Sequence, residues 1–221
     1  MVSYLMTTIN RLDITPDVTA KNILNANYPI SEILITDNGS SQKDMIVWGM
    51  KAADIFTHNE TNIGNPQSFN RMLQRCQGDY IVIAGNDIQL PKDWLKKAVE
   101  LAKDPKVGLV GFDWRDEPRK ETYKTMKLTQ GCPFGTWVFH RRLLDDVGYF
   151  NEWSKYGLWD SAYALRCKAK GLLNGYVLNA PSKHVGADVG ENSDYRRMKN
   201  EEMNKAKPHY SKLIKELAIN K

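Results

Sequence analysis

The stretch that most constrains this chain is Tyr80–Leu95, which reads YIVIAGNDIQLPKDWL. It opens with five consecutive apolar or aromatic residues, and Gly85 then interrupts the run. A short β-branched run bounded by glycine is typical of a fully buried strand. Pro91 and the spacing of apolar residues from Trp94 to Ala102 then predict a helix. The stretch therefore predicts a buried strand, a tight turn and a helix in direct succession.

Asp87 lies in the turn between this strand and this helix. In open parallel sheets, ligands bind at the carboxyl ends of the strands. A carboxylate at such an end is well placed to hold a divalent cation on a diphosphate, because hard cations prefer oxygen ligands. The alternative is that Asp87 is only a turn residue that leads into the helix.

The rest of the chain repeats the alternation of strands and helices, most regularly from residue 3 to about residue 103. The predicted strands are Ser3–Thr8, Ile33–Thr36, Asp54–His58, Tyr80–Ala84, Val107–Phe112, Gly135–His140 and Gly175–Asn179. The other predicted helices are Asp13–Tyr28 with Thr15 as N-cap, Gln42–Ala53, Pro66–Gln77, Arg141–Val147, Gly157–Lys170 and Pro208–Ile219. Residues 113–127 are expected to form a loop. This order predicts an α/β fold: one Rossmann-like domain with a mainly parallel sheet flanked by helices, and a C-terminal helical tail.

Polar residues gather where the predicted strands end. They are Asn10 and Arg11, Asp37, the segment from Asn62 to Asn70, Asp87 and His184. Because the ends of parallel strands share one edge of the sheet, these residues predict a site of nucleotide size. No G-x-G-x-x-G follows the first strand and no G-x-x-x-x-G-K-[ST] occurs, which disfavours dinucleotide oxidoreductases and P-loop enzymes.

Composition narrows the class of protein. The formal charge of +5 suits an anionic ligand, although two of these excess positive charges lie in a Lys/Arg-rich segment after Ala187. The three cysteines are widely spaced and odd in number, which indicates reduced thiols in a cytoplasmic protein. We expect no membrane-spanning segment, because no run of about 18 apolar residues occurs. The N-terminal residues indicate a first strand rather than a signal peptide.

Five segments, taken together and in this order, resemble the family-2 glycosyltransferases of the GT-A fold. They are SYLMTTINR, ILITDNGSS, NIGNPQSFN, AGNDIQLPKDWL and the segment from Gly135 to Gly171 that contains HRRLLDDVGYFNEWSKYGLWD. Each motif is weak by itself, whereas five in order at plausible spacing are strong. The resemblance covers about Ser3–Gly186.

The resemblance implies a GT-A domain over residues 1–190, with a nucleotide-sugar-binding half at 1–103 and an acceptor and catalytic half at 104–190. A basic helical tail would follow at 191–221. The implied donor is a uridine or deoxythymidine diphosphate sugar, used with Mn²⁺ or Mg²⁺. The basic tail would allow a nucleic-acid acceptor and equally a glycan or a protein acceptor.

The resemblance also implies roles for particular residues. Asp160 would be the general base of an inverting transfer. Asp87 and His184 would bind the metal. The implied nucleotide-binding residues are Thr8, Asn10, Arg11, Asp37, Asn62, Gly64, Asn70 and Asn86. Each role has a structural alternative: Asp37 can cap a turn, His184 can be an ordinary structural histidine, and Asp160 can be an acid favoured near a helix start.

Two departures from the family pattern bear on activity. Gly85 stands where many members have an acid or Asn, and Trp159 replaces the Glu of a Glu-Asp pair. A third, Ile9, replaces the usual Tyr near the nucleobase. The departures keep open a binding module for nucleotide sugars or nucleic acid that has lost catalysis. A sugar nucleotidyltransferase is a further reading, although the Gly-rich basic N-terminal loop of that class is absent.

Overall fold

A computed structural model of the chain describes residues 1–113, 121–133, 135–186 and 194–217. The strands are β1 Val2–Thr8, β2 Glu32–Asp37, β3 Ile55–His58, β4 Tyr80–Ala84, β5 Ile88–Gln89, β6 Val107–Gly111, β7 Thr122–Tyr123, β8 Met126–Leu128, β9 Trp137–His140, β10 Leu173–Val177 and β11 Lys183–His184. The helices are α1 Thr15–Asn25, α2 Lys43–Ala52, α3 Asn65–Leu73, α4 Trp94–Ala102, α5 Leu143–Asp146, α6 Trp159–Ala169 and α7 Asp194–Glu216.

Nine strands form one twisted sheet in the order β3-β2-β1-β4-β9-β6-β10-β8-β7. Neighbouring strands from β3 to β4 are parallel, and β10 is parallel to β6. β9 lies between β4 and β6 and is antiparallel to both. The predicted α/β class with a mainly parallel sheet is therefore confirmed, and a hairpin of β7 and β8 closes one edge.

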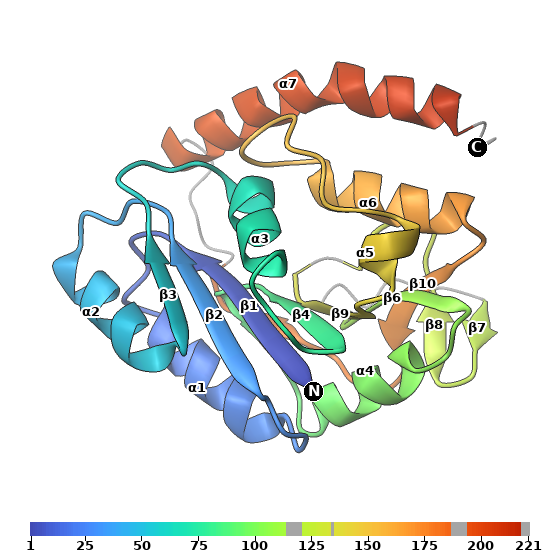
Figure 1. Ribbon diagram of the computed structural model, residues 1–221, viewed down its shortest axis with the longest axis horizontal. Coiled ribbons are helices and arrows are strands. Elements are labelled where there is room, and N and C mark those ends of the chain that lie inside the picture. Colours follow the sequence, from blue (N-terminus) through green and yellow to red (C-terminus); the bar gives the residue numbers. More distant parts are fainter. Residues whose placement is uncertain (114–120, 134, 187–193, 218–221) are drawn as a thin grey trace.

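Helices cover both faces of this sheet (Figure 1). Alternate residues of each central strand point to opposite faces, so Tyr4 and Met6 pack towards α1 and α4, whereas Leu5 packs towards α3 and α6. The first core includes the fully buried Trp94. The second core is rich in aromatic rings, with Trp137 and Tyr163 at its centre. The two cores hold the strands of the sheet in place on both faces. The ends of these strands are therefore held in fixed positions, and a site can form there.

Three local expectations were wrong. Within the predicted loop of residues 113–127, residues from Thr122 onward belong to the hairpin of β7 and β8, whereas residues 114–120 lie outside the described part. Thr15 begins α1 but is not its N-cap, because Ile14 takes that position and no side chain caps the helix. The last long strand is Leu173–Val177 rather than 175–179, since Asn179 has a positive φ of 53° that ends an extended segment.

The C-terminal helix also differs from the expectation. α7 begins at Asp194 rather than at Pro208, and Pro208 lies inside it. The prediction placed proline at a helix start, where its missing N–H costs nothing. The longer helix is held by tertiary contacts: Ala206 is fully buried, and the buried Glu202 accepts a hydrogen bond from the Lys155 backbone N–H. None of the helices in the described ranges is long and apolar enough to cross a membrane.

Candidate functional site

Two cavities open along the carboxyl edge of the parallel strands. The first has a volume of about 520 Å³ and the second about 530 Å³. They share the residues Thr7, Asn65, Asn86, Asp87, Tyr156, His184 and Lys199. Because one wall belongs to both, a ligand in the first cavity would border a ligand in the second.

The shared wall carries a carboxylate–imidazole pair. Asp87 Oδ2 lies 3.0 Å from His184 Nε2, and each side chain is 26% exposed. Their meeting depends on a small antiparallel sheet in which β11 pairs with β5, so that His184 stands opposite Ile88. Gly186 makes room for this contact, because a Cβ at position 186 would lie only 2.8 Å from the Asp87 Cβ. The two predicted metal ligands, far apart in sequence, are therefore neighbours.

This pair fits a divalent cation. Octahedral Mg²⁺ takes ligands at about 2.0–2.1 Å, so two neighbouring ligands stand about 3 Å apart. The carboxylate oxygen and the imidazole nitrogen lie 3.0 Å apart in a direct hydrogen bond. Two neighbouring ligands of one cation have the same separation, so a cation would replace this hydrogen bond. Within the described ranges, no group of three His, Cys, Asp or Glu side chains could hold a metal. The remaining coordination positions therefore suit phosphate oxygens and water.

The turn that carries Asp87 is fixed by α1 and leaves no room for a second acid. The Asn22 side chain donates to the Ile88 carbonyl at 2.8 Å and accepts from the Leu90 N–H at 2.8 Å. At Gly85, a Cβ would lie 2.8 Å from the Ile88 side chain. Close packing at this position therefore accounts for the departure of Gly85 from the family pattern.

Asp160 lies in the first turn of α6 and lines the second cavity together with Asp87 and His184. Its Oδ1 accepts a hydrogen bond of 2.7 Å from the Ser161 N–H. Burial raises the pKa of the Asp160 carboxyl above its ordinary range, while the nearby Lys199 charge opposes that rise in pKa. A half-buried carboxylate with a raised pKa beside a cavity is a stronger proton acceptor than an ordinary aspartate.

Trp159, the second departure from the family pattern, belongs to the core. Its ring centroid lies 5.0 Å from Phe150, 5.6 Å from Phe69 and 6.2 Å from Trp137. This aromatic packing anchors the start of α6 and so positions the adjacent Asp160.

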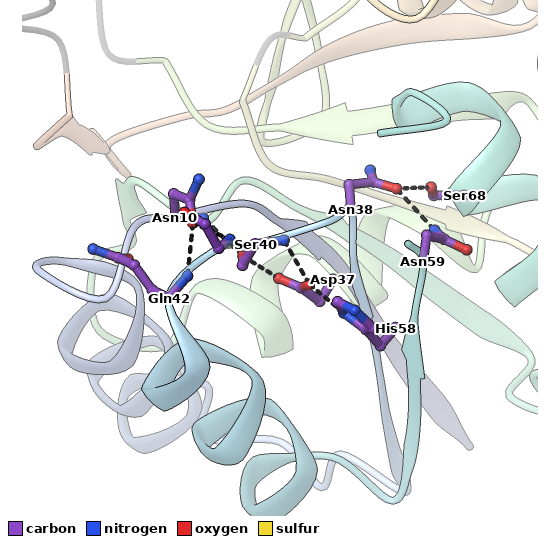
Figure 2. Close-up of polar contacts among 9 residues, drawn as sticks. Asn10, Asp37, Asn38, Ser40, Gln42, His58, Asn59 and Ser68 are labelled. Carbon is purple, nitrogen blue, oxygen red and sulfur yellow. Dashed lines mark hydrogen bonds and ion pairs between the residues drawn. The ribbon is translucent and has the colours of Figure 1, made fainter. Parts of the chain in front are cut away.

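Asp37 is fully buried at the end of β2 and does not line either cavity. Figure 2 shows its carboxylate between Ser40 and His58. One oxygen accepts from the Ser40 N–H at 3.0 Å and contacts His58 Nδ1 at 2.8 Å, and the other accepts from the Ser40 hydroxyl. These contacts are those of a turn-capping aspartate, and a direct contact with a nucleobase stays a prediction.

Asn10 lies next to this group and lines the first cavity. It has a positive φ of 48°, and its side-chain oxygen accepts from the backbone N–H groups of Ser41 and Gln42 just before α2 (Figure 2). The neighbouring Arg11 also lines this cavity, and its guanidinium pairs with Asp13 through two hydrogen bonds. This end of the site is therefore organised by contacts within the protein.

Asn62, Gly64 and Asn70 support the loop of residues 150–157. Asn62 donates to the Tyr156 hydroxyl at 2.8 Å. Asn70 bonds both the N–H and the carbonyl of Phe150. Gly64 has a φ of +93°, and a Cβ there would lie 2.4 Å from the Lys155 Cα. None of the three predicted residues lines either of these two cavities, and a nucleotide contact stays a prediction for each.

The structure thus gathers a subset of the predicted residues. Those that line one or both cavities are Thr8, Asn10, Arg11, Asn86, Asp87, Asp160 and His184. Sequence reasoning missed Tyr156, Arg196 and Lys199, which also line them. The i, i+3 spacing of Arg196 and Lys199 was the available signal, but the helix of the basic tail was predicted to begin only at Pro208.

Comparison with known proteins identifies the family of the chain. The model of the family described as "Glycosyl transferase family 2" matches residues 3–153. No curated protein matches the chain significantly in sequence.

Solved structures share the fold at low sequence identity. A mannosyltransferase from Pyrobaculum calidifontis, PcManGT, in complex with GDP-Man and Mn²⁺, has a TM-score of 0.75 at 21% identity, over 97% of this chain and 64% of that one. GalNAc-T7 with UDP, GalNAc and Mn²⁺ has a TM-score of 0.69 at 12% identity, over 83% and 43%. S. aureus TarS 1-349 with UDP-GlcNAc has a TM-score of 0.63 at 12% identity, over 98% and 71%.

The chain spans less than two thirds of the length of the first of these structures. The family match, in contrast, covers most of this chain, from the first strand to the loop before α6. The chain belongs to glycosyl transferase family 2 and has the GT-A fold.

Proposed function

We propose that this chain transfers a sugar from a nucleotide-diphosphate donor to an acceptor hydroxyl, assisted by Mn²⁺ or Mg²⁺. One observation carries the proposal: the Asp87–His184 pair and Asp160 line the same cavity. A metal site and a candidate base in one cavity are what metal-assisted sugar transfer needs. The complexes of the similar structures with nucleotide sugars, UDP and Mn²⁺ support the choice of donor and metal.

In this proposal the donor lies in the first cavity and the acceptor in the second. Thr8, Asn10 and Arg11 would border the nucleoside, and Asp87 with His184 would hold the cation. Such a cation neutralises the negative charge that develops on the leaving diphosphate. Residues 1–103 would then supply most of the donor site and residues 104–190 most of the acceptor site.

Asp160 acts as the general base. Its carboxylate removes the proton of the acceptor hydroxyl as the new bond from the acceptor oxygen to the anomeric carbon forms. The bond from that carbon to the diphosphate oxygen breaks, so the anomeric configuration inverts. The raised pKa of Asp160 makes it a stronger base than an ordinary aspartate.

The finer proposals concern donor, acceptor and location. We propose a UDP- or dTDP-sugar donor and an acceptor that is a glycan, a protein or a nucleic acid. We propose a cytoplasmic location, which the three free, buried cysteines support.

The alternative, a binding module without catalysis, loses its main support. It rested on Gly85 and Trp159, and both residues have packing reasons that leave Asp87 and Asp160 beside the cavity. No described feature favours a sugar nucleotidyltransferase.

A donor screen tests the proposal. UDP-, dTDP- and GDP-sugars are incubated with the protein and Mn²⁺, and hydrolysis or transfer is measured beside the thermal shift. We expect the protein to bind and turn over a uridine or deoxythymidine donor only when the metal is present. A thermal shift with no turnover of any donor, with glycan, protein and DNA acceptors supplied, would favour the binding module instead.

A further inference from the structure

The segment between α5 and α6 carries an aromatic residue, Tyr156, that lines both cavities. Asp87 and His184, the proposed metal ligands, belong to the same shared wall. Among the described residues of this wall, Tyr156 is the one tyrosine, phenylalanine or tryptophan. An aromatic ring therefore stands at the junction of the two cavities, beside the place proposed for the cation.

Hydrogen bonds from two helices and from the loop itself fix the backbone around Tyr156. The Lys155 N–H donates to the Glu202 carboxylate of α7 at 2.7 Å, and the Lys155 carbonyl accepts from the Asn65 N–H at the start of α3 at 3.0 Å. The Ser154 hydroxyl donates to the Tyr156 carbonyl at 2.8 Å. The loop thus runs between α3 and α7 and is bonded to both (Figure 1). Its position relative to the shared wall is therefore set by the fold.

The hydroxyl group of Tyr156 is held by a residue outside the cavities. It accepts a 2.8 Å hydrogen bond from the side chain of Asn62, which lines neither cavity. The Asn62 side-chain oxygen accepts from the Gly64 N–H at 2.9 Å, which fixes the orientation of the amide. With its polar tip engaged in this way, Tyr156 borders the cavities mainly with its ring.

A bound nucleotide sugar would place its sugar ring at this junction. The sugar is attached directly to the second phosphate, so a diphosphate held by a cation at Asp87 and His184 leaves the sugar next to the same wall. Its anomeric carbon must also be open to the second cavity, where Asp160 lies and the acceptor would approach. A pyranose presents C–H groups on a face of its ring. Such a face packs well on an aromatic ring, because apolar surface leaves water and the C–H hydrogens meet the negative face of the π system.

We propose that the ring of Tyr156 packs against the sugar ring of the donor and holds its anomeric carbon between the two cavities. This inference rests on the proposed function, because it assumes a diphosphate at Asp87 and His184. It gives Tyr156 a role in binding and positioning the sugar that is separate from the binding of the nucleotide.

Titration calorimetry in the presence of Mn²⁺ tests the proposal with three matched pairs: UDP-GlcNAc with UDP, dTDP-glucose with dTDP, and GDP-Man with GDP. Tyr156→Ala should weaken binding of the best nucleotide sugar by about 10-fold, as expected for the loss of one buried apolar contact. The affinity for the corresponding nucleoside diphosphate should change by less than about 2-fold, because that ligand has no sugar to lose the contact. Tyr156→Phe keeps the ring and should bind the nucleotide sugar nearly as tightly as the wild type.

Tyr149→Ala is the matched control. Tyr149 lies in the same segment, is 41% exposed and lines neither cavity. Its loss should change the affinity for both members of each pair by less than about 2-fold, as for an ordinary surface substitution. Thermal melting of every variant establishes that the protein remains folded. If Tyr156→Ala unfolds, Tyr156→Leu replaces it, with an expected weakening of at least about 3-fold because the flat ring is lost.

The outcomes separate this inference from the proposed function. If the Tyr156 variant without a ring binds the nucleotide sugar as tightly as the wild type, the inference is wrong and the proposed function stands. An equal loss of affinity for the nucleotide sugar and for its nucleoside diphosphate would mean that Tyr156 only supports the loop, which also overturns the inference alone. If the wild type binds none of the three nucleotide sugars with Mn²⁺, the inference and the proposed function are both overturned.

Discussion

The two ends of the first cavity use their polar residues differently. At the end formed by β2 and the start of α2, the Asp37 carboxylate is fully buried and Ser40 and His58 occupy its oxygens. At the end formed by β5 and β11, Asp87 and His184 contact each other while each remains 26% exposed. Both ends hold an aspartate at a strand end, but only the second aspartate lines the cavity.

The difference shows that a strand-end carboxylate can serve the fold or the site, depending on what surrounds it. Asp37 is followed by Asn38-Gly39-Ser40, a turn whose own N–H and hydroxyl groups reach back to the carboxylate. The turn after Asp87 is instead held by Asn22 from α1, so the carboxylate is left to face the cavity. A mutation of Asp37 should therefore change mainly stability, whereas a mutation of Asp87 should change mainly ligand binding.

The largest expected effect is at Asp87. Asp87→Ala should abolish Mn²⁺-dependent donor binding, because a single carboxylate anchors the cation, and it should leave the melting temperature nearly unchanged. Calorimetric titration of the donor with and without Mn²⁺ measures the effect. His184→Ala should weaken metal binding less, since water can replace one neutral ligand.

Asp145→Ala provides the control for Asp87, because Asp145 is an exposed acid that lines neither cavity. It should bind donor and metal as the wild type does. Unchanged metal dependence in Asp87→Ala would remove the metal assignment from this end of the cavity.

The next effect is at Asp160. Asp160→Asn can still accept the Ser161 hydrogen bond but cannot take a proton, so we expect transfer to slow by about 100-fold or more with normal donor binding. In the wild type the transfer rate should fall on the acid side with an apparent pKa above the ordinary range of aspartate, because burial raises the pKa of Asp160. Rate and donor affinity, measured on the same variant, test the assignment; an almost unchanged rate would indicate a helix-start residue only.

Asp160 also predicts a trend in stability. A raised folded-state pKa means that the folded protein binds this proton more tightly than the unfolded chain, so the stabilising contribution is greatest at acidic pH and is lost as pH rises through the folded pKa. At a pH above the folded pKa, the ionised carboxylate therefore costs stability. Asp160→Asn should melt at a temperature no lower than the wild type there, which thermal denaturation at neutral and acidic pH would check.

The smallest effect on binding and the clearest effect on stability are expected at Asp37. Asp37→Ala leaves the Ser40 N–H without its partner and should lower the free energy of unfolding by about 1–3 kcal/mol. Urea denaturation measures this loss. The opposite outcome is an unchanged free energy of unfolding together with a loss of about 1–3 kcal/mol in UDP binding but not in GDP binding. That outcome would mean that Asp37 contacts the nucleobase and serves the site as Asp87 does.

Much of this arrangement was predictable from local sequence. The run Tyr80–Ala84 had to form a buried strand, and its turn had to deliver Asp87 to the edge of the sheet, because burial of β-branched residues and the chemistry of Gly-Asn-Asp act within a few residues. The alternation of strands and helices then determined a mainly parallel sheet and hence a shared edge.

What the tertiary structure alone decided is which of the polar residues face the cavity. Whether Asp37 or Asp87 is exposed depends on partners such as His58 and Asn22, which lie twenty or more residues away. The position of His184 depends on pairing between β11 and β5, and that of Lys199 on a helix held by buried contacts despite Pro208. These contacts join distant parts of the chain, so their energies leave no periodic pattern in the sequence.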